Sequence, residues 1–243
     1  MLLVCDYDGT LFRKKHWFEL EENLSSLRAF RAASPENKVM IATGRDFYSF
    51  VMNRPLRIVY DYLSCYNGLV LYQEDTTVVK ENTVSKEQIR KINDIVRYYD
   101  GLPYLRFVQA KRTVASASMA NPCLGYELAM DIFPRMNECF LEIIDHFPNL
   151  VCDPLDDEEQ PCIFLHNPSD KCDMIDYLCN IEGIAQDDVY VIGDSLNDKK
   201  MIEKYRGATL YSALSGVQAI ASSTHPSVSV YVKKILKNQN NRK

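Results

Sequence analysis

Short apolar runs alternate along much of this chain with segments in which apolar residues recur at helical spacing. The expected strands are Leu2–Cys5, Lys38–Thr43, Tyr62–Tyr66, Val189–Ile192 and Ala208–Tyr211. The expected helices are Leu20–Ala33, Asp46–Asn53, Ser169–Asn180, Asn197–Tyr205 and Ser215–Ser222. Nearly continuous apolar strands that alternate with helices are typical of parallel sheets covered on both faces. The pattern therefore predicts an α/β fold with an open, mostly parallel sheet.

The middle of the chain has a different pattern. The strands expected there are Tyr104–Gln109, Arg112–Ala117 and Cys162–His166, and the helices are Ser85–Tyr98 and Asn137–Phe147. In the first of these helices Ile89, Ile92 and Ile95 share one face, which makes the helix amphipathic. Ser85 and Gln88 can form a capping box at its start. We expect a smaller α+β domain, residues 73–167, inserted into a core of residues 1–72 and 168–243.

Composition and charge narrow the classes of protein to which the chain can belong. Of its 243 residues, 47% are hydrophobic and 25% are charged, which excludes a disordered chain and a disulfide-stapled miniprotein. The formal net charge of -5 argues against a nucleic-acid partner. The basic ending Lys233–Lys243 is interpreted as a solvated terminus, and the acidic run Asp153–Glu159 as a solvated loop.

The cysteines and the lengths of the apolar runs indicate the cellular compartment of the protein. The eight cysteines form no C-x-x-C pair and mostly lie in apolar runs, so we expect reduced thiols and no zinc site. Asp6 comes too early for the apolar stretch of a signal peptide, and no apolar run reaches the roughly 18 residues of a membrane span. We therefore expect a cytoplasmic protein without a membrane partner.

The first expected strand runs directly into the sequence DYDGTL at residues 6–11. In open α/β sheets ligands bind beyond the carboxyl ends of the strands, where Asp6 and Asp8 lie. Two carboxylates held together repel each other unless a cation or a proton offsets their charge, so we infer a divalent metal. An ordinary Asp-Gly turn at the end of a strand is the alternative interpretation.

Two further strand ends carry candidate groups. Thr43-Gly44-Arg45 lies between a strand and a helix, where a hydroxyl, backbone N–H groups and the helix dipole can bind a phosphate. Arg45 can add charge-assisted hydrogen bonds or is alternatively only a surface residue, and Thr43 is alternatively an ordinary helix cap. The strand Val189–Ile192 ends in GDSLND at residues 193–198, which supplies further carboxylates or, alternatively, a turn and a helix cap.

Lys171 lies in the first turn of the expected helix Ser169–Asn180, where a cation opposes the helix dipole. An anionic group nearby would explain that position, and a solvent-facing lysine is the alternative. In chain order, the sequence thus offers an acid pair, a phosphate cradle, a lysine and a second acid pair. That combination is what an aspartate-based, magnesium-dependent phosphoryl-transfer site requires.

These residues resemble the motifs of the haloacid dehalogenase (HAD) superfamily of phosphatases, in particular its Cof-type branch, which has a C2-type cap between the second and third motifs. The resemblance lies in DYDGTL at residues 6–11, TGR at 43–45, Lys171 and GDSLND at 193–198. Tyr66-Asn67-Gly68 is similar to the Ser/Thr-Asn-Gly of the branch, whereas Cys172 stands where the branch usually has Gly. The resemblance implies a Rossmann-like, HAD-like core with an inserted cap domain.

The resemblance also implies a role for each matched residue. Asp6 would be the nucleophile that forms an aspartyl-phosphate, and Asp8 would protonate the leaving group and then activate water. The residues implied to bind the substrate phosphate are Thr43, Gly44, Arg45 and Lys171. The residues implied to hold Mg²⁺ are Asp6, Asp8 and Asp194, with Asn197 and Asp198 in support.

The implied function is a magnesium-dependent phosphatase that acts on a small-molecule phosphate ester, with a sugar phosphate as the first choice. A phosphomutase on the same core would return the phosphate to its substrate, and a receiver-like signalling module would keep it on an aspartate. The polar residues of the insertion that could contact the leaving group are Arg106, Lys111, Arg112 and Asn121. The sequence does not indicate an oligomeric state.

Overall fold

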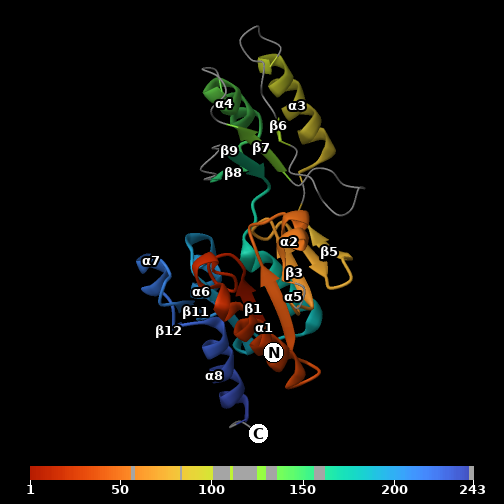
Figure 1. Ribbon diagram of the computed structural model, residues 1–243. Coiled ribbons are helices and arrows are strands. Elements are labelled where there is room, and N and C mark those ends of the chain that lie inside the picture. Colours follow the sequence, from red (N-terminus) through yellow and green to blue (C-terminus); the bar gives the residue numbers. More distant parts are fainter. Residues whose placement is uncertain are drawn as a thin grey trace. The chain divides into compact units, whose positions relative to one another are not determined.

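The structure is a computed structural model that describes residues 1–55, 58–82, 84–100, 110–111, 125–129, 136–155 and 162–240. The chain divides into two compact units (Figure 1). The first unit comprises Met1–Arg45, Ser49–Lys80 and Asp170–Lys243. The second unit comprises Asp46–Tyr48 and Glu81–Ser169.

The first unit is built on an eight-stranded sheet with the order β12-β11-β10-β1-β2-β3-β4-β5. These strands are β12 (Ser223–His225), β11 (Ala208–Leu210), β10 (Val189–Gly193), β1 (Leu2–Asp6), β2 (Lys38–Ala42), β3 (Tyr62–Cys65), β4 (Val70–Gln73) and β5 (Val78–Glu81). All neighbours from β12 to β3 pair in parallel, and β4 runs antiparallel to β3. The predicted open, mostly parallel sheet is therefore confirmed.

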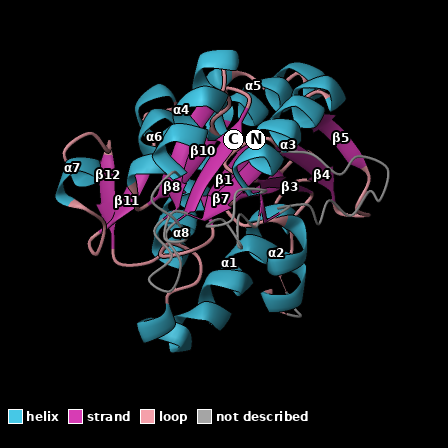
Figure 2. Ribbon diagram, turned by 90° about the horizontal axis from the view of Figure 1, so that it is seen from above, coloured by secondary structure: helices cyan, strands magenta, loops and turns pink. Residues whose placement is uncertain are grey.

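Helices cover both faces of this sheet (Figure 2). They are α1 (Leu20–Ala32), α2 (Phe47–Asn53), α5 (Lys171–Glu182), α6 (Lys199–Lys204), α7 (Ser215–Gln218) and α8 (Val228–Asn240), with 3₁₀ turns η1 (Lys14–Glu19), η2 (Gln186–Asp188) and η3 (Leu196–Asp198). Leu2 and Val4 of β1 pack in one core cluster with Met174 of α5. Because side chains alternate along a strand, Leu3 and Cys5 point to the other face, which α1 and α8 cover (Figure 2).

The described part of the basic ending belongs to the helix α8, whose lysines are exposed, as expected of a solvated terminus, but whose apolar side is packed. Val232 and Ile235 of α8 are buried, and α8 packs against α1. The Nζ atom of Lys233 lies 2.7 Å from an Oε1 atom of Glu22 on α1. Apolar residues continue at helical spacing through the basic run, and the lysines occupy the solvent side of the same helix.

The second unit contains a four-stranded sheet with the order β6-β7-β9-β8, in which every pair is antiparallel. Its elements are β6 (Ala110–Lys111), α3 (Lys86–Asp100), β7 (Gly125–Ala129), α4 (Met136–His146), β8 (Val151–Leu155) and β9 (Cys162–His166). The predicted capping box is confirmed, because the Gln88 N–H donates to Ser85 Oγ at 3.2 Å and the Ser85 N–H to Gln88 Oε1 at 2.9 Å.

Some of the elements expected in the second unit lie outside the described residues, and one expected loop is a strand. The strands expected at Tyr104–Gln109 and Arg112–Ala117 lie outside the described residues, as do Arg106, Arg112 and Asn121. The acidic run begins inside β8, so its interpretation as a loop is wrong for residues 153–155. Pairing of β8 with β9 places these residues in the sheet although two of the three are typical of turns.

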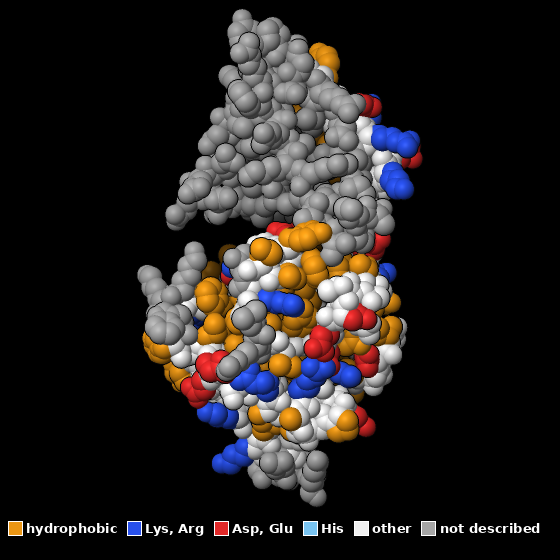
Figure 3. Space-filling view, turned by 45° about the vertical axis from the view of Figure 1, so that its right-hand side comes forward, with side chains coloured by type: hydrophobic (Ala, Val, Ile, Leu, Met, Phe, Trp, Pro, Cys, Tyr) orange, Lys and Arg blue, Asp and Glu red, His pale blue; other side chains and the backbone are white. Residues whose placement is uncertain are grey.

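On the face drawn in Figure 3, basic side chains are intermixed with acidic ones. Within the described parts of the chain, none of the helices has both the length and the apolar character that crossing a bilayer requires.

Candidate active site

The sheet of the first unit reverses its strand order between β1 and β10. From β1 the chain proceeds to β2 and β3 on one side, and from β10 it proceeds to β11 and β12 on the other. Ligands of open α/β sheets bind beyond the carboxyl ends of the strands at such a switch point. Asp6 is the last residue of β1, and Asp194 directly follows β10. The two strands are neighbours, and Cys5 of β1 pairs with Ile192 of β10. The topology therefore delivers both aspartates to one place.

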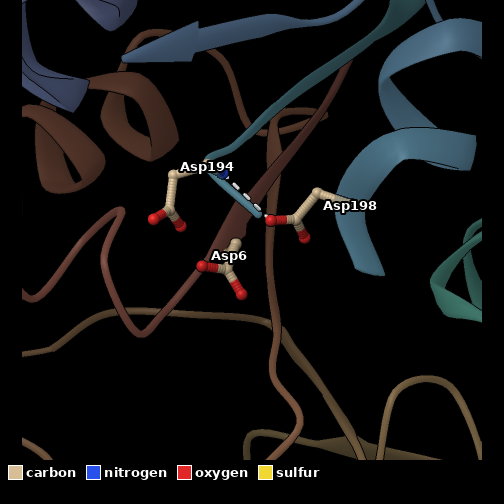
Figure 4. Close-up of side chains that lie close together, drawn as sticks. All are labelled: Asp6, Asp194 and Asp198. Atoms are coloured by element: carbon tan, nitrogen blue, oxygen red, sulfur yellow. Dashed lines mark hydrogen bonds between the residues drawn. The ribbon is translucent and has the colours of Figure 1, made fainter. Parts of the chain in front are cut away.

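Three carboxylates meet at this switch point. Asp6, Asp194 and Asp198 each offer an oxygen that lies within 4.8 Å of the others, and Figure 4 shows the side chains converging from β1 and from the segment after β10. Asp6 is 4% exposed and Asp198 is fully buried. Like charges at this separation need a compensating cation or proton.

One oxygen of this cluster lacks a protein partner. The Oδ2 atom of Asp6 is buried and has no hydrogen-bond partner among the described residues. A buried acceptor without a donor is costly, and oxygen ligands are those that hard divalent cations take. The acidic cluster therefore fits a divalent metal ion, for which Asp6 and Asp194 offer direct ligand oxygens.

Lys171 supplies a positive charge inside the cluster. Its Nζ atom lies 2.6 Å from Asp6 Oδ1 and 2.6 Å from Asp198 Oδ1, and the side chain is 1% exposed, so the solvent-facing alternative does not hold. Asp170 caps α5 and forms a capping box with Asp173, which fixes Lys171 as the first helical residue. Three carboxylates against one ammonium leave two negative charges, the charge that a divalent cation offsets.

The pKa values of these groups are displaced by burial and by one another. Burial raises the pKa of Asp6 well above its ordinary value, the charge of Asp198 adds to this, and Lys171 opposes it. Burial also raises the pKa of Asp194, against a hydrogen bond from Thr10 that lowers it. For Lys171, burial would lower the pKa, but the charges of Asp6 and Asp198 outweigh it and the pKa is raised. The lysine therefore remains an ammonium ion at neutral pH.

Asp198 organises the segment after β10. Its Oδ1 atom accepts from Lys171, and its Oδ2 atom accepts the backbone N–H groups of Asp194 and Ser195, each at 3.0 Å. Both oxygens are therefore already in use within the protein. The position suits the supporting role expected from the sequence more than that of a direct metal ligand.

Gly9 and Thr10 hold Asp194 in place. Gly9 has φ +82°, and a Cβ atom at this position would lie 2.3 Å from Asp194 Oδ2. The Thr10 hydroxyl donates to Asp194 Oδ1 at 2.8 Å. The sequence predicted no role for Thr10, although this residue belongs to the DYDGTL run. The signal that could have found it is a hydroxyl four residues after the strand-end carboxylate Asp6 and two residues after Asp8.

The loop after β2 contains the other predicted residues. Thr43 is buried, and its Oγ1 atom accepts the backbone N–H of Arg45 at 3.1 Å. Thr43 therefore stabilises the turn that leaves β2. It is not the cap of α2, because that helix begins only at Phe47. Arg45 contacts Asp8 through two hydrogen bonds, Nε to Oδ2 and Nη2 to Oδ1, both 2.6 Å long. Asp8 lies apart from the acidic cluster, and its side chain is 48% exposed.

Asn67 joins the loops after β2 and β10, a role that was not predicted from the sequence. Its N–H donates to the Thr43 carbonyl at 3.0 Å, and its Oδ1 atom accepts from Asn197 Nδ2 at 3.0 Å. Tyr66 and Asn67 have φ +55° and +52°, a left-handed conformation that is uncommon for residues other than glycine. Such strain is concentrated at functional sites, and the Asn-Gly pair was its signal in the sequence.

The chain resembles known proteins over most of its length. The family profile described as haloacid dehalogenase-like hydrolase matches residues 3–133 and 133–230. A Mycoplasma pneumoniae protein named "Putative phosphatase" is 25% identical over 239 residues, covering 84% of each chain. A hypothetical protein from Geobacillus kaustophilus HTA426 has a TM-score of 0.74 at 19% identity, covering 96% of this chain and 98% of that one. A haloacid dehalogenase-like hydrolase from Bacteroides thetaiotaomicron has a TM-score of 0.70 at 20% identity, with 96% and 98% covered.

Proposed function

The chain belongs to the haloacid dehalogenase-like hydrolases, and from that premise we propose that it is a magnesium-dependent phosphatase of a small phosphate ester. The observation that carries the proposal is the close approach of Asp194 and the buried pair Asp6–Lys171 at the switch point of the sheet. We propose a sugar phosphate as the substrate class, and an aspartyl-phosphate on Asp6 as the intermediate. Covalent catalysis of this kind replaces one difficult displacement by two easier ones.

Asp6 is the proposed nucleophile. Its carboxylate attacks phosphorus, and the bond between phosphorus and the leaving oxygen breaks. Lys171 holds Asp6 Oδ1 at 2.6 Å, which fixes the carboxylate and places an ammonium ion next to the developing charge. In the second half of the reaction a water oxygen attacks phosphorus, and the electron pair of the broken bond returns to Asp6.

The remaining groups position the phosphate and move protons. The Thr43 hydroxyl accepts from the Arg45 N–H and still has its own proton to donate to a phosphate oxygen, beside the backbone at Gly44. Asp8 gives a proton to the leaving oxygen and then takes one from the attacking water. Asp6 and Asp194, together with the Asp8 carbonyl that the resemblance implies, would hold Mg²⁺, with Asn197 and Asp198 in support. The bound metal would supply positive charge next to the phosphoryl oxygens.

The insertion is the proposed determinant of specificity. The insertion expected at residues 73–167, apart from the edge strand β5 that belongs to the sheet of the first unit, would form a cap domain that contacts the leaving group, as the family resemblance implies. Residues 1–72 and 168–243 would form the catalytic core. Differences in contacts to the leaving group change the relative kcat/KM of competing substrates. A screen of sugar phosphates, nucleotides and phosphorylated cofactors is therefore expected to show a preference within one class.

Phosphate release tests this function directly. We expect the purified protein to release inorganic phosphate from a generic aryl phosphate in the presence of Mg²⁺. Phosphate release should stop when a chelator removes the metal and should resume when Mg²⁺ is added back. Ca²⁺ is expected to substitute poorly because it takes more ligands at longer distances. Transfer of phosphate to another position of a sugar phosphate would support a mutase instead, and a stable aspartyl-phosphate without turnover would support a receiver.

Magnesium is expected to raise the melting temperature more at about pH 8 than at about pH 5. Burial raises the pKa of Asp6 and Asp194, so the metal-free folded protein keeps protons on these carboxyls that the unfolded chain has lost. Stability without metal should therefore fall as the pH rises above the unfolded pKa of about 4. Since metal binding displaces those protons, the stabilisation by Mg²⁺ should grow over the same range.

Thermal unfolding with and without Mg²⁺ at both pH values measures this effect. Asp194→Asn is expected to lose most of the magnesium-dependent shift, because it removes one of the direct ligand oxygens. Asp187→Asn, a change of an exposed aspartate in η2, is the matched control and should keep the shift. A shift that is equal at both pH values would contradict the proton-linked binding of metal at this cluster.

A further inference from the structure

Arg45 holds the side chain of Asp8 by both of its oxygens. The Nε–Oδ2 and Nη2–Oδ1 distances are both 2.6 Å, the paired geometry in which a guanidinium and a carboxylate interact most strongly. The Asp8 side chain is 48% exposed, against 5% for Asp6. Burial therefore fixes the side chain of Asp6 but not that of Asp8. The pairing with Arg45 restricts the Asp8 side chain, which would otherwise rotate in solvent.

Arg45 is itself fixed at both ends. Its N–H donates to Thr43 Oγ1 at 3.1 Å, and its carbonyl accepts from the Tyr66 N–H at 3.1 Å. The guanidinium carbon lies 5.2 Å from the centre of the Tyr7 ring, a cation–π contact. Tyr7 is buried and its ring packs edge-on against Phe50 at 5.1 Å. The guanidinium is thus placed by the loop after β2 and by the buried ring between the two motif aspartates.

The pairing of Arg45 with Asp8 suits the second half of the reaction, in which water attacks the aspartyl-phosphate. A carboxylate that accepts both hydrogen bonds of a guanidinium is an acceptor only, whereas a carboxylic acid carries a proton on one oxygen and keeps at most one of these bonds. The paired form is therefore the one that accepts a proton from water. In that step water attacks the aspartyl-phosphate, its proton passes to Asp8, the bond from phosphorus to Asp6 breaks, and inorganic phosphate leaves.

On the basis of the proposed function, we propose that Arg45 is a positioning residue that holds the Asp8 carboxylate for hydrolysis of the aspartyl-phosphate, in place of the phosphate-binding role expected from the sequence. The two roles predict different kinetics. Loss of a positioning group slows the breakdown of the intermediate more than its formation. Loss of a phosphate ligand weakens binding of the substrate and slows the formation of the intermediate.

Rapid-quench kinetics of Arg45→Gln and Arg45→Lys with an aryl phosphate and Mg²⁺ separate these roles. We expect an initial burst of aryl alcohol at close to the unaltered rate, followed by steady-state turnover slowed at least about tenfold. The aspartyl-phosphate should accumulate toward one per protein and be trapped by acid quenching. Arg45→Lys should resemble Arg45→Gln, because lysine keeps the charge but cannot form the paired hydrogen bonds.

Arg31→Gln is the matched control, since Arg31 also binds carboxylates, Asp61 and Glu74, but lies outside the site. It should leave the kinetics unchanged. An initial burst of aryl alcohol from the Arg45 variants would itself show that they are folded, because only a folded active site forms the intermediate. A raised KM with no accumulated intermediate, or an Arg45→Lys variant equal to the unaltered protein, would overturn the positioning role. Absence of phosphate release by the unaltered protein would instead contradict the proposed phosphatase function.

Discussion

Asp6→Asn is expected to lower magnesium-dependent phosphate release by at least about 10⁴-fold, because the amide cannot form the proposed aspartyl-phosphate. The exchange keeps the size of a residue that is 4% exposed, so the core around β1 should remain packed. It also removes one of three mutually repelling carboxylates, and Lys171 keeps its contact with Asp198 at 2.6 Å. The variant should therefore fold with nearly unaltered stability while it loses activity.

Phosphate release and trapping of the labelled intermediate measure the effect. The variant should yield no acid-stable phosphoprotein, whereas Asp187→Asn, the exposed aspartate in η2, should label and turn over as the unaltered protein does. Turnover by Asp6→Asn within tenfold of the unaltered protein would remove Asp6 from the chemistry, and with it the proposed mechanism.

Lys171→Met is expected to lower the free energy of unfolding by about 3–5 kcal/mol, because it leaves Asp6 and Asp198 buried without their cation. Activity should be lost as well, since no ammonium ion then fixes Asp6, the proposed nucleophile. Denaturation by urea with constant m value measures the change in stability. Added Mg²⁺ should recover part of the lost stability, because the variant retains all three carboxylates.

Lys200→Met is the matched control for this change. Lys200 also pairs with an aspartate, at 2.8 Å from Asp170 Oδ2, but its side chain is 74% exposed. Water and salt screen that pair, so its loss should cost less than about 1 kcal/mol. If Lys171→Met proved as mild as Lys200→Met, the buried lysine would not be compensating the carboxylates of the site.

The parts of the fold that follow from local pattern were predictable. β1 and β9 are apolar runs with clear boundaries, and the observed strands agree with the expected ones to within one residue. The position of Asp6 and Asp194 followed from the rule that parallel strands present their carboxyl ends at one edge. The misplaced cation in the first turn of α5 was also informative, because Lys171 does meet anionic groups there.

Other features depend on contacts that the sequence does not encode locally. The helix α8 was missed because its lysines dominate the composition of a segment whose buried face needs only a residue every third or fourth position. The left-handed turn at Tyr66 and Asn67 is imposed by its bonds to a distant loop. The partner of Arg45 could not be read from the sequence, because either a bound phosphate or Asp8 satisfies a guanidinium at that position.

The central position of β1 has a consequence for synthesis of the protein. Its neighbour β2 follows within the same stretch of chain, but its other neighbour β10 is translated only after the whole insertion, and α8, which packs on α1, is translated after β10. During translation the amino-terminal segment therefore waits with one edge of β1 unpaired, a state that invites chaperone binding or aggregation. The nascent polypeptide can assemble the complete cluster of three carboxylates only when Asp198 has emerged from the ribosome.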